Sequence, residues 1–267
     1  MPSYLVTGAS RGLGYAFAKH LASIEGNTVF GLVRNQAATE ARLNNDGVTK
    51  VHLVVADITD PKALEAAALQ ISHMTCGSLD VLINNAALLS ERSQWTSLLD
   101  HETDELEEEL MSSFKANVVG TAHTINAFLP LIRKGQVKKV ITLSTGVADL
   151  DLTNQYALAN VAPYSISKAA TNMLVAKYNA ALGKSEGILF LSISPGMVDT
   201  SEGKESSEQD IAGYQKMTAK FAQYAPHFVG PITPEESVRM QMAVIEEATV
   251  ERSGGAFVSH LGNKQWL

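Results

Sequence analysis

A short glycine-rich segment near the start of the chain decides the fold: Thr7-Gly8-Ala9-Ser10-Arg11-Gly12-Leu13-Gly14. It follows the apolar run Tyr4–Thr7 and opens the amphipathic stretch Leu13–Ile24, an order that predicts a strand, a turn and a helix. Glycines allow a tight turn and let a pyrophosphate approach the N–H groups at the helix N-terminus. Three glycines also occur in turns without a ligand, but their place between a strand and a helix favours a phosphate-binding loop.

Short apolar runs alternate with longer amphipathic stretches along most of the chain. Strands are predicted at Tyr4–Thr7, Thr28–Val33, Val51–Val55, Val81–Asn84, Val140–Leu143, Ile188–Ile193 and Ala256–Val258, and helices at Leu13–Ile24, Pro61–Ser72, Glu102–Lys134, Tyr164–Leu182 and Pro234–Glu247. Strands that are apolar throughout suit a parallel sheet buried on both faces. The alternation predicts an α/β fold, a Rossmann-like doubly wound domain whose seven-stranded parallel sheet has helices on both faces.

One segment interrupts this alternation. Ser201–Pro231 is rich in Ser, Glu, Gln, Lys and Tyr, and it is longer than a normal connection between a strand and a helix. Since ligands bind at the carboxyl ends of parallel strands, we expect residues 201–231 to be a lid insertion over the substrate site. No linker rich in Pro, Gly or Ser divides the chain, so residues 1–267 are interpreted as a single domain.

The composition limits the partners and the compartment. The formal charge of −7 disfavours nucleic acid as a partner, and no apolar run approaches the roughly 20 residues that cross a bilayer.

Cys76 is the only cysteine, which excludes an intramolecular disulfide and favours a reducing compartment. The first strand begins within a few residues of Met1, leaving no room for a signal peptide. A cytoplasmic location is expected, with no membrane partner. No His-x-x-x-His or Cys-x-x-Cys spacing predicts a metal.

Further motifs follow the glycine loop in a fixed order. They are Asp57 after the third strand, Asn84-Asn85-Ala86-Ala87, Asn117 before Val-Val-Gly, Tyr164-Ser-Ile-Ser-Lys168 and Pro195-Gly196. Together with the glycine loop they resemble the short-chain dehydrogenase/reductase family over nearly the whole chain, with Ala87 where the family has Gly. The resemblance implies a nicotinamide cofactor and the cofactor-binding residues Gly8, Ser10, Arg11, Gly12, Leu13, Gly14, Arg34, Asp57, Ile58, Asn85, Ala86, Tyr164, Lys168, Pro195, Gly196, Val198 and Thr200.

The end of the second predicted strand bears on the choice between NAD and NADP. NAD enzymes usually place an acidic residue there to bind the ribose hydroxyls, whereas NADP enzymes need a cation for the 2′-phosphate. The sequence after the strand reads Arg34-Asn35, with no Asp or Glu. Arg34 can offer a fork of donors to a phosphate, and Arg11 can reach the same pocket. The sequence therefore predicts NADP(H).

Four residues are the catalytic candidates. Tyr164 and Lys168 are four apart in a helical pattern, so they share a face, and a nearby cation is expected to lower the pKa of the tyrosine that supplies a proton. Ser144 ends the fifth predicted strand where the family's substrate-orienting Ser stands, and Thr145 is the alternative. Ser144 and Tyr164 are further apart than in most family members; the extra residues fall within Asp149–Ala162. The resemblance makes Asn117 a helix-interrupting residue that links Lys168 to solvent through a water.

These observations predict an NADP(H)-dependent carbonyl reductase or alcohol dehydrogenase with a small-molecule substrate and Tyr164 as proton donor. The alternatives are a non-redox enzyme of the same fold, such as a dehydratase or an epimerase, and a regulatory protein that senses NADP without turnover. The long helices at 102–134 and 164–182 carry apolar residues on more than one face, which predicts a homodimer or a homotetramer. The sequence leaves the substrate and the direction of the reaction open.

Overall fold

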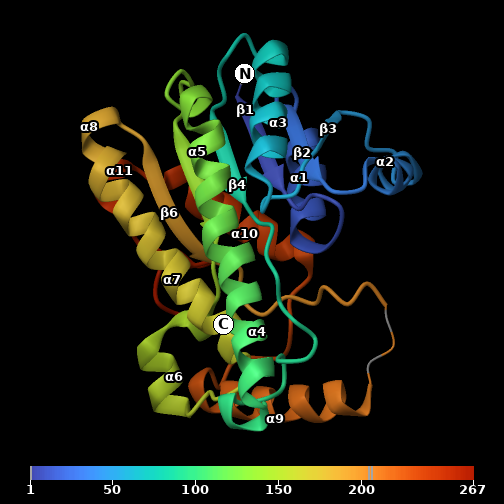
Figure 1. The fold of residues 1–267 in the computed structure, drawn as a ribbon, viewed down its shortest axis with the longest axis vertical. Helices are drawn as coiled ribbons and strands as arrows, with labels where there is room; N and C mark the ends of the chain where they lie inside the picture. The colour runs from blue at the N-terminus through green and yellow to red at the C-terminus, as the bar shows by residue number, and fades with distance from the viewer. Residues whose placement is uncertain (1, 204, 206) are drawn as a thin grey trace.

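Seven parallel strands form one sheet in the order β3-β2-β1-β4-β5-β6-β7 (Figure 1). The strands are β1 (Ser3–Thr7), β2 (Thr28–Val33), β3 (Val51–Val55), β4 (Val81–Asn84), β5 (Lys139–Leu143), β6 (Leu189–Ser194) and β7 (Phe257–Ser259). The structure, a computed structural model, describes residues 2–203, 205 and 207–267. All six pairings are parallel, and the strand order changes direction between β1 and β4. The predicted α/β fold with a seven-stranded parallel sheet is confirmed.

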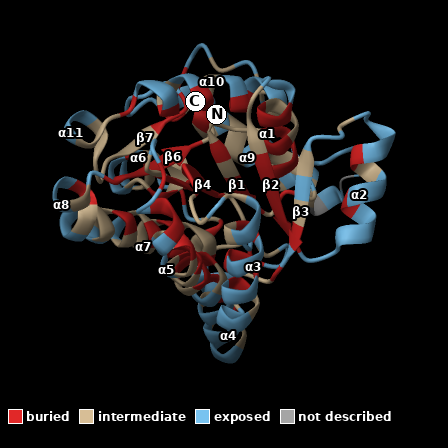
Figure 2. Cartoon of the chain, turned by 90° about the horizontal axis from the view of Figure 1, so that it is seen from above, coloured by how far each residue is buried: buried red, intermediate tan, exposed pale blue. Residues whose placement is uncertain are grey.

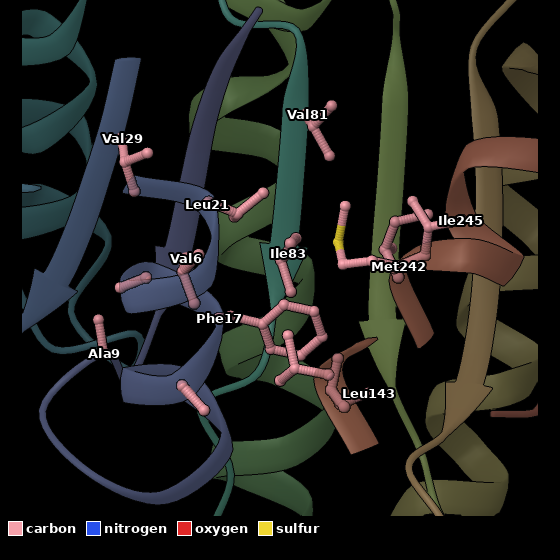
Figure 3. Packing of buried hydrophobic residues seen from close by; sticks show 14 of the residues in the cluster. Val6, Ala9, Phe17, Leu21, Val29, Val81, Ile83, Leu143, Met242 and Ile245 are labelled. Carbon is pink, nitrogen blue, oxygen red and sulfur yellow. The ribbon is translucent and has the colours of Figure 1, made fainter. Parts of the chain in front are cut away.

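Helices cover both faces of the sheet. On one face, α1 (Gly12–Ser23) and α10 (Pro234–Glu247) bury Phe17, Leu21, Met242 and Ile245 against apolar strand residues (Figure 3). On the other face, α3 (Pro61–Met74), α5 (Gly120–Ile132) and α7 (Ala162–Tyr178) pack through a second apolar cluster centred on Phe30, Phe128 and Phe190. Burial on both faces explains why the strands are apolar throughout.

Some predicted helices have different bounds in the structure. The predicted helix 102–134 is divided into α4 (Thr103–Phe114), a π-helical turn (Lys115–Val119) and α5. Similarly, α7 ends at Tyr178 and continues in a π-helical turn, Asn179–Gly183. Five α-helices among the described residues were not predicted: α2 (Gln36–Asn45), α6 (Leu150–Tyr156), α8 (Lys184–Glu186), α9 (Glu208–Tyr224) and α11 (Val250–Ser253). Figure 2 shows that α2 is largely exposed beside the edge strand β3, consistent with its weak apolar pattern.

The segment predicted as a lid contains a long helix, α9 (Glu208–Tyr224). In Figure 1, α9 and α6 lie together at the end of the molecule toward which β1 runs, near the C-terminus. A third apolar cluster joins these parts, with Leu152 from α6, Phe221 from α9 and Trp266 from the C-terminal tail. The carboxyl ends of the strands therefore face a layer built from three segments that are distant in the sequence.

Candidate active site

The glycine loop connects β1 to α1 and is tied to the end of β4. The Thr7 hydroxyl accepts hydrogen bonds from the backbone N–H groups of Asn85 and Ala86, both at 3.0 Å. The Asn85 side-chain amide donates to the carbonyl oxygen of Thr7 at 2.9 Å. A Cβ at Gly14 would overlap the carbonyl oxygen of Gly8, so the first turn of α1 can approach the loop only with glycine there. The loop is thereby held rigidly against β4.

Gly12 presents its N–H at the first position of α1, where a helix attracts anions. Its φ of +53° lies in the region that favours glycine. The N–H of Gly12 donates to Oε1 of Glu202 at 3.0 Å, so a carboxylate occupies the position that suits a phosphate oxygen. Thr200 adjoins the same turn, with its Cγ2 3.4 Å from where a Gly12 Cβ would stand. Leu13 packs against the apolar cluster under α1.

A pocket beside the glycine loop is lined by Ser10, Arg34, Asn35, Ala38 and Thr39. No carboxylate is among these lining residues. The Asn35 side chain accepts a hydrogen bond from the Ala38 N–H and so begins α2, which forms one wall. Arg34 is exposed and lines the pocket, whereas Arg11 is exposed but is not among the lining residues. The structure thus brings Ser10 and Arg34 together at one pocket, and the contribution of Arg11 to it stays a prediction.

Asp57 follows β3 and closes a turn by accepting hydrogen bonds from the backbone and hydroxyl of Thr59, at 2.8 and 2.7 Å. The bond from the Thr59 backbone, helped by its hydroxyl and by the charge of Arg34, holds the pKa of Asp57 below its usual value against the effect of burial. The next residue, Ile58, packs against Gly120 at the start of α5. Asp57 therefore stays ionised near neutral pH beside Arg34.

Tyr164 and Lys168 lie on one face of α7, next to the end of β5. The Lys168 ammonium donates to the carbonyl oxygen of Leu143 at 2.7 Å and lies 5.7 Å from the centre of the Tyr164 ring. The side chain of Lys168 is buried, with 2% of the residue exposed. Leu143 precedes Ser144, so this hydrogen bond brings α7 to the end of β5 that carries the Ser144 hydroxyl.

The pKa values at this pair are governed by burial. Desolvation raises the pKa of Tyr164 to about 12 and lowers the pKa of Lys168 to about 8. Burial is the cause of the raised pKa of Tyr164, and the expected lowering of that pKa by the Lys168 ammonium stays a prediction. Tyr164 is a neutral phenol at neutral pH, with a proton to donate, and Lys168 is largely an ammonium there.

Ser144 extends β5 toward the site. Its N–H donates to the carbonyl oxygen of Ile193 at 2.7 Å, which fixes the backbone. Its hydroxyl is buried and has no hydrogen-bond partner among the described residues. A buried hydroxyl without a hydrogen-bond partner lowers stability unless a ligand supplies that partner. Thr145, the alternative, is half-buried and begins the short 3₁₀ turn Gly146–Ala148. The unpaired hydroxyl favours Ser144 for the substrate contact.

Asn117 lies at the centre of the π-helical turn and is completely buried. Its carbonyl oxygen accepts hydrogen bonds from the hydroxyls of Thr121 (2.7 Å) and Thr171 (3.1 Å). Its side-chain amide accepts from the N–H of Leu88 at 2.7 Å and donates to the Leu88 carbonyl and the Ser167 hydroxyl, both at 2.9 Å. The helix is interrupted as expected. The side chain, however, holds the loop after β4, and the water link to Lys168 stays a prediction.

The turn after β6 carries the remaining predicted residues. The Pro195 carbonyl accepts a hydrogen bond from the Ser237 hydroxyl of α10 at 2.7 Å, and Gly196 has a φ of +83°. Val198 forms an isolated parallel bridge with Ile232, which pins the turn to the segment before α10. These contacts leave Thr200 beside Gly12, so the turn and the glycine loop meet.

Residues that the sequence did not assign to the site also border it. The His260 imidazole lies against Gly196; its Nδ1 is buried without a partner among the described residues, and burial lowers the pKa of His260. Trp266 fills the space beside Gly146, so that a Cβ on that glycine would lie 2.6 Å from the Trp266 Cβ. Arg42 contacts Glu202 at the glycine loop. Each comes from a segment without a motif, and no local signal marks it.

Two features of the described residues bear on other functions. No helix among them is long and apolar enough to cross a bilayer. Within residues 2–203, 205 and 207–267, no group of three or more His, Cys, Asp or Glu side chains is arranged to hold a metal ion.

The sequence is similar to known proteins over its whole length. A family model described as short chain dehydrogenase matches residues 3–211. Over 267 residues, and 100% of both chains, the sequence is 58% identical to the short-chain dehydrogenase/reductase AacuF of Aspergillus aculeatus. It is 46% identical over 272 residues, and 100% of both chains, to the short chain dehydrogenase virK of Hypocrea virens.

Solved structures show the same fold. An NADPH-bound carbonyl reductase from chicken fatty liver has a TM-score of 0.77 at 24% identity, with 98% of both chains covered. The carbonyl reductase Sniffer of D. melanogaster has a TM-score of 0.76 at 22% identity, again with 98% of both chains covered. With its motifs, its sheet and these full-length relatives, the chain belongs to the short-chain dehydrogenase/reductase family, a family of oxidoreductases.

Proposed function

We propose that this protein is an NADP(H)-dependent carbonyl reductase or alcohol dehydrogenase that acts on a small molecule, with Tyr164 as the proton donor. The observation that carries the proposal is the contact of Lys168 with Leu143, 2.7 Å, which brings the Tyr164–Lys168 pair to the end of β5. Beside it stands the unpaired hydroxyl of Ser144. A phenol, an ammonium and a hydroxyl at one strand end suit a carbonyl oxygen that gains negative charge.

The residues of the glycine loop fit a dinucleotide. Gly8 and Gly14 leave no room for a side chain, and the Gly12 N–H already binds a carboxylate, which shows that the position accepts an anionic oxygen. NADP(H) supplies or accepts the hydride when it is bound. We assign further cofactor contacts to residues beside this loop and in the turn after β6. They are Asn85 and Ala86, which bind Thr7, Thr200, which adjoins Gly12, and the turn residues Pro195, Gly196 and Val198.

The preference for NADP(H) rests on Arg34 and Arg11. Arg34 lines the pocket beside Ser10, whose lining residues carry no carboxylate to repel a 2′-phosphate. A planar guanidinium binds a phosphate through paired, charge-assisted hydrogen bonds. The NADPH-bound state of the chicken carbonyl reductase, which has the same fold, is in keeping with this choice.

The chemistry of the chain's own residues follows from their pKa values. Burial keeps Tyr164 protonated, so in the reductive direction its hydroxyl donates the proton to the carbonyl oxygen. Ser144 donates a hydrogen bond to the same oxygen as negative charge develops. The Lys168 ammonium lies near enough to stabilise the resulting tyrosinate. Asn117 acts at a distance as a positioning residue, because it fixes the Leu88 loop and Ser167 on α7.

The test is a panel of ketones and aldehydes in which the loss of NADPH absorbance and the alcohol formed are measured together. Equal amounts of NADPH oxidised and alcohol formed are expected. Turnover without net NADPH oxidation would indicate a dehydratase or an epimerase, and NADPH binding without turnover of any carbonyl would indicate a sensor.

The assembly and the compartment are part of the proposal. We propose that residues 1–267 act as one domain, with 201–231 as the lid, in the cytoplasm. We also propose a homodimer or homotetramer, because the exposed apolar side chains include Met111 and Phe114 on α4 and Ile166 and Met173 on α7.

A further inference from the structure

Glu202, at the start of the lid segment, contacts the glycine loop and α2 at the same time. Its Oε1 accepts a hydrogen bond from the Gly12 N–H at 3.0 Å and one from Nη1 of Arg42 at 2.8 Å. Gly12, Arg42 and Glu202 are far apart in the sequence, and folding brings them together. A single carboxylate oxygen thus bridges the anion-binding end of α1 and a guanidinium group.

Arg42 is held in place by its own neighbours. Its guanidinium lies 4.1 Å from the centre of the Tyr15 ring, and Nη1 is also 3.4 Å from the carbonyl oxygen of Ser10. The Tyr15 hydroxyl in turn donates to Asp46 at 2.7 Å. The arginine therefore points at the glycine loop through contacts that remain if Glu202 leaves.

We propose that Glu202 is an internal substitute for a phosphate, and that the diphosphate of the nicotinamide cofactor displaces it and takes Arg42 as an additional cationic ligand. The inference rests on the proposed cofactor. Neither Glu202 nor Arg42 belongs to the motifs named above. The proposal rests on Oε1 of Glu202, which accepts hydrogen bonds from both Gly12 and Arg42.

Charge explains why the two anions exclude each other. The hydrogen bonds from Gly12 and Arg42 outweigh desolvation and hold the pKa of Glu202 below its usual value, so the side chain is ionised near neutral pH. A phosphate at Gly12 and an ionised carboxylate on the same N–H would repel each other at contact distance. Occupation of the site by Glu202 therefore reduces the fraction of protein that is ready for the cofactor, and the apparent Kd rises by that factor.

The first test measures the Kd of NADPH and of NADH by fluorescence titration of wild-type protein and of Glu202→Gln. The amide keeps the size of the side chain but loses the charge. Because the Arg42–Glu202 pair is partly exposed, we expect a modest effect, with both Kd values falling about three- to tenfold. Glu235→Gln is the charge-matched control, since Glu235 lines the pocket that Arg42 and Glu202 also line. Its Kd values should stay within about twofold of wild type.

The second test is Arg42→Gln, made in the Glu202→Gln background. If Arg42 binds the diphosphate, which both cofactors share, the Kd of NADPH and of NADH should rise by similar factors. Weakening of NADPH alone would place Arg42 on the 2′-phosphate and overturn the diphosphate assignment. Unchanged Kd values in Glu202→Gln, with wild-type binding intact, would overturn this inference and leave the proposed function standing. A wild-type protein that binds neither cofactor would overturn both.

Discussion

Replacing Tyr164 by Phe removes one hydroxyl from the centre of the proposed mechanism. The ring, the turn of α7 and the Lys168–Leu143 hydrogen bond remain. No hydrogen bond joins the Tyr164 hydroxyl to another residue in the part of the chain that the structure describes, so the change should cost little folding stability. The loss should therefore appear in the chemical step.

General acid catalysis typically contributes about 10²–10⁴-fold, so kcat should fall by at least about 10². A fall of about 10²- to 10⁴-fold in kcat corresponds to an increase of about 3–5 kcal/mol in the activation free energy. The binding of NADPH should change only a few-fold, because Gly12, Arg34 and the end of β4 are untouched. Water replaces the phenol poorly as a donor in a buried site, which is why a large residual rate is not expected.

The measurement compares turnover and NADPH affinity in the same Tyr164→Phe preparation. Single-turnover loss of NADPH absorbance reports the chemical step, and fluorescence titration reports the Kd. Ser144→Ala beside Thr145→Ala serves as a second comparison, and the Ser variant should lose more activity because the Ser144 hydroxyl is fully buried without a partner among the described residues, whereas Thr145 is half-buried. Turnover near the wild-type value with bound NADPH would remove Tyr164 from the mechanism.

Four further predictions concern the cofactor, the pH profile, the assembly and the lid. Arg34→Asp should shift the ratio of kcat/KM for NADPH over NADH toward NADH by about one to two decades, since a charged hydrogen bond contributes about 1.5–3 kcal/mol; equal use of both cofactors by wild type would contradict the assignment. With its pKa lowered to about 8, Lys168 is charged below that pH, so kcat/KM for reduction should fall as pH rises through about 8; a flat profile to pH 10 would contradict this. Light scattering at micromolar concentration should show a dimer or a tetramer, and Met173→Glu should weaken it; a wild-type monomer would refute the assembly. Hydrogen exchange should show α9 less protected than β5 in the free protein and more protected with NADPH and substrate; core-like protection without ligand would refute a mobile lid.

The fold could be predicted because its signals are local. Strands buried on both faces are mostly apolar, as Val81–Ile83 are in β4, and the glycine loop must lack side chains where Gly14 meets Gly8. The weakly amphipathic α2 was missed because it covers only the edge of the sheet and buries just Thr39 and Leu43. A polar sequence that packs on one side of an edge strand looks like a loop.

The layer over the carboxyl ends of the strands could not be predicted, because its contacts join distant segments. Trp95 donates a hydrogen bond to Asp210 of α9 at 2.8 Å and packs against Gly213. The Tyr224 hydroxyl, at the other end of α9, accepts from the Trp266 N–H at 2.9 Å. Composition identified residues 201–231 as an insertion near the site. The helix α9 begins with a capping box formed by Ser207 and Asp210, but no pattern within the segment reveals which distant residues it contacts.

The direction of the Tyr164 pKa shows where spacing stops being informative. The four-residue interval placed Tyr164 and Lys168 on one face, and the structure agrees, with the ammonium 5.7 Å from the ring centre. Spacing carries no information on desolvation, however, and burial moves the two pKa values apart, raising that of Tyr164 to about 12 and lowering that of Lys168 to about 8. Both shifts favour the neutral forms, because a buried charge loses its hydration. Tyr164 is therefore protonated near neutral pH and holds the proton that the proposed reduction transfers to the carbonyl oxygen.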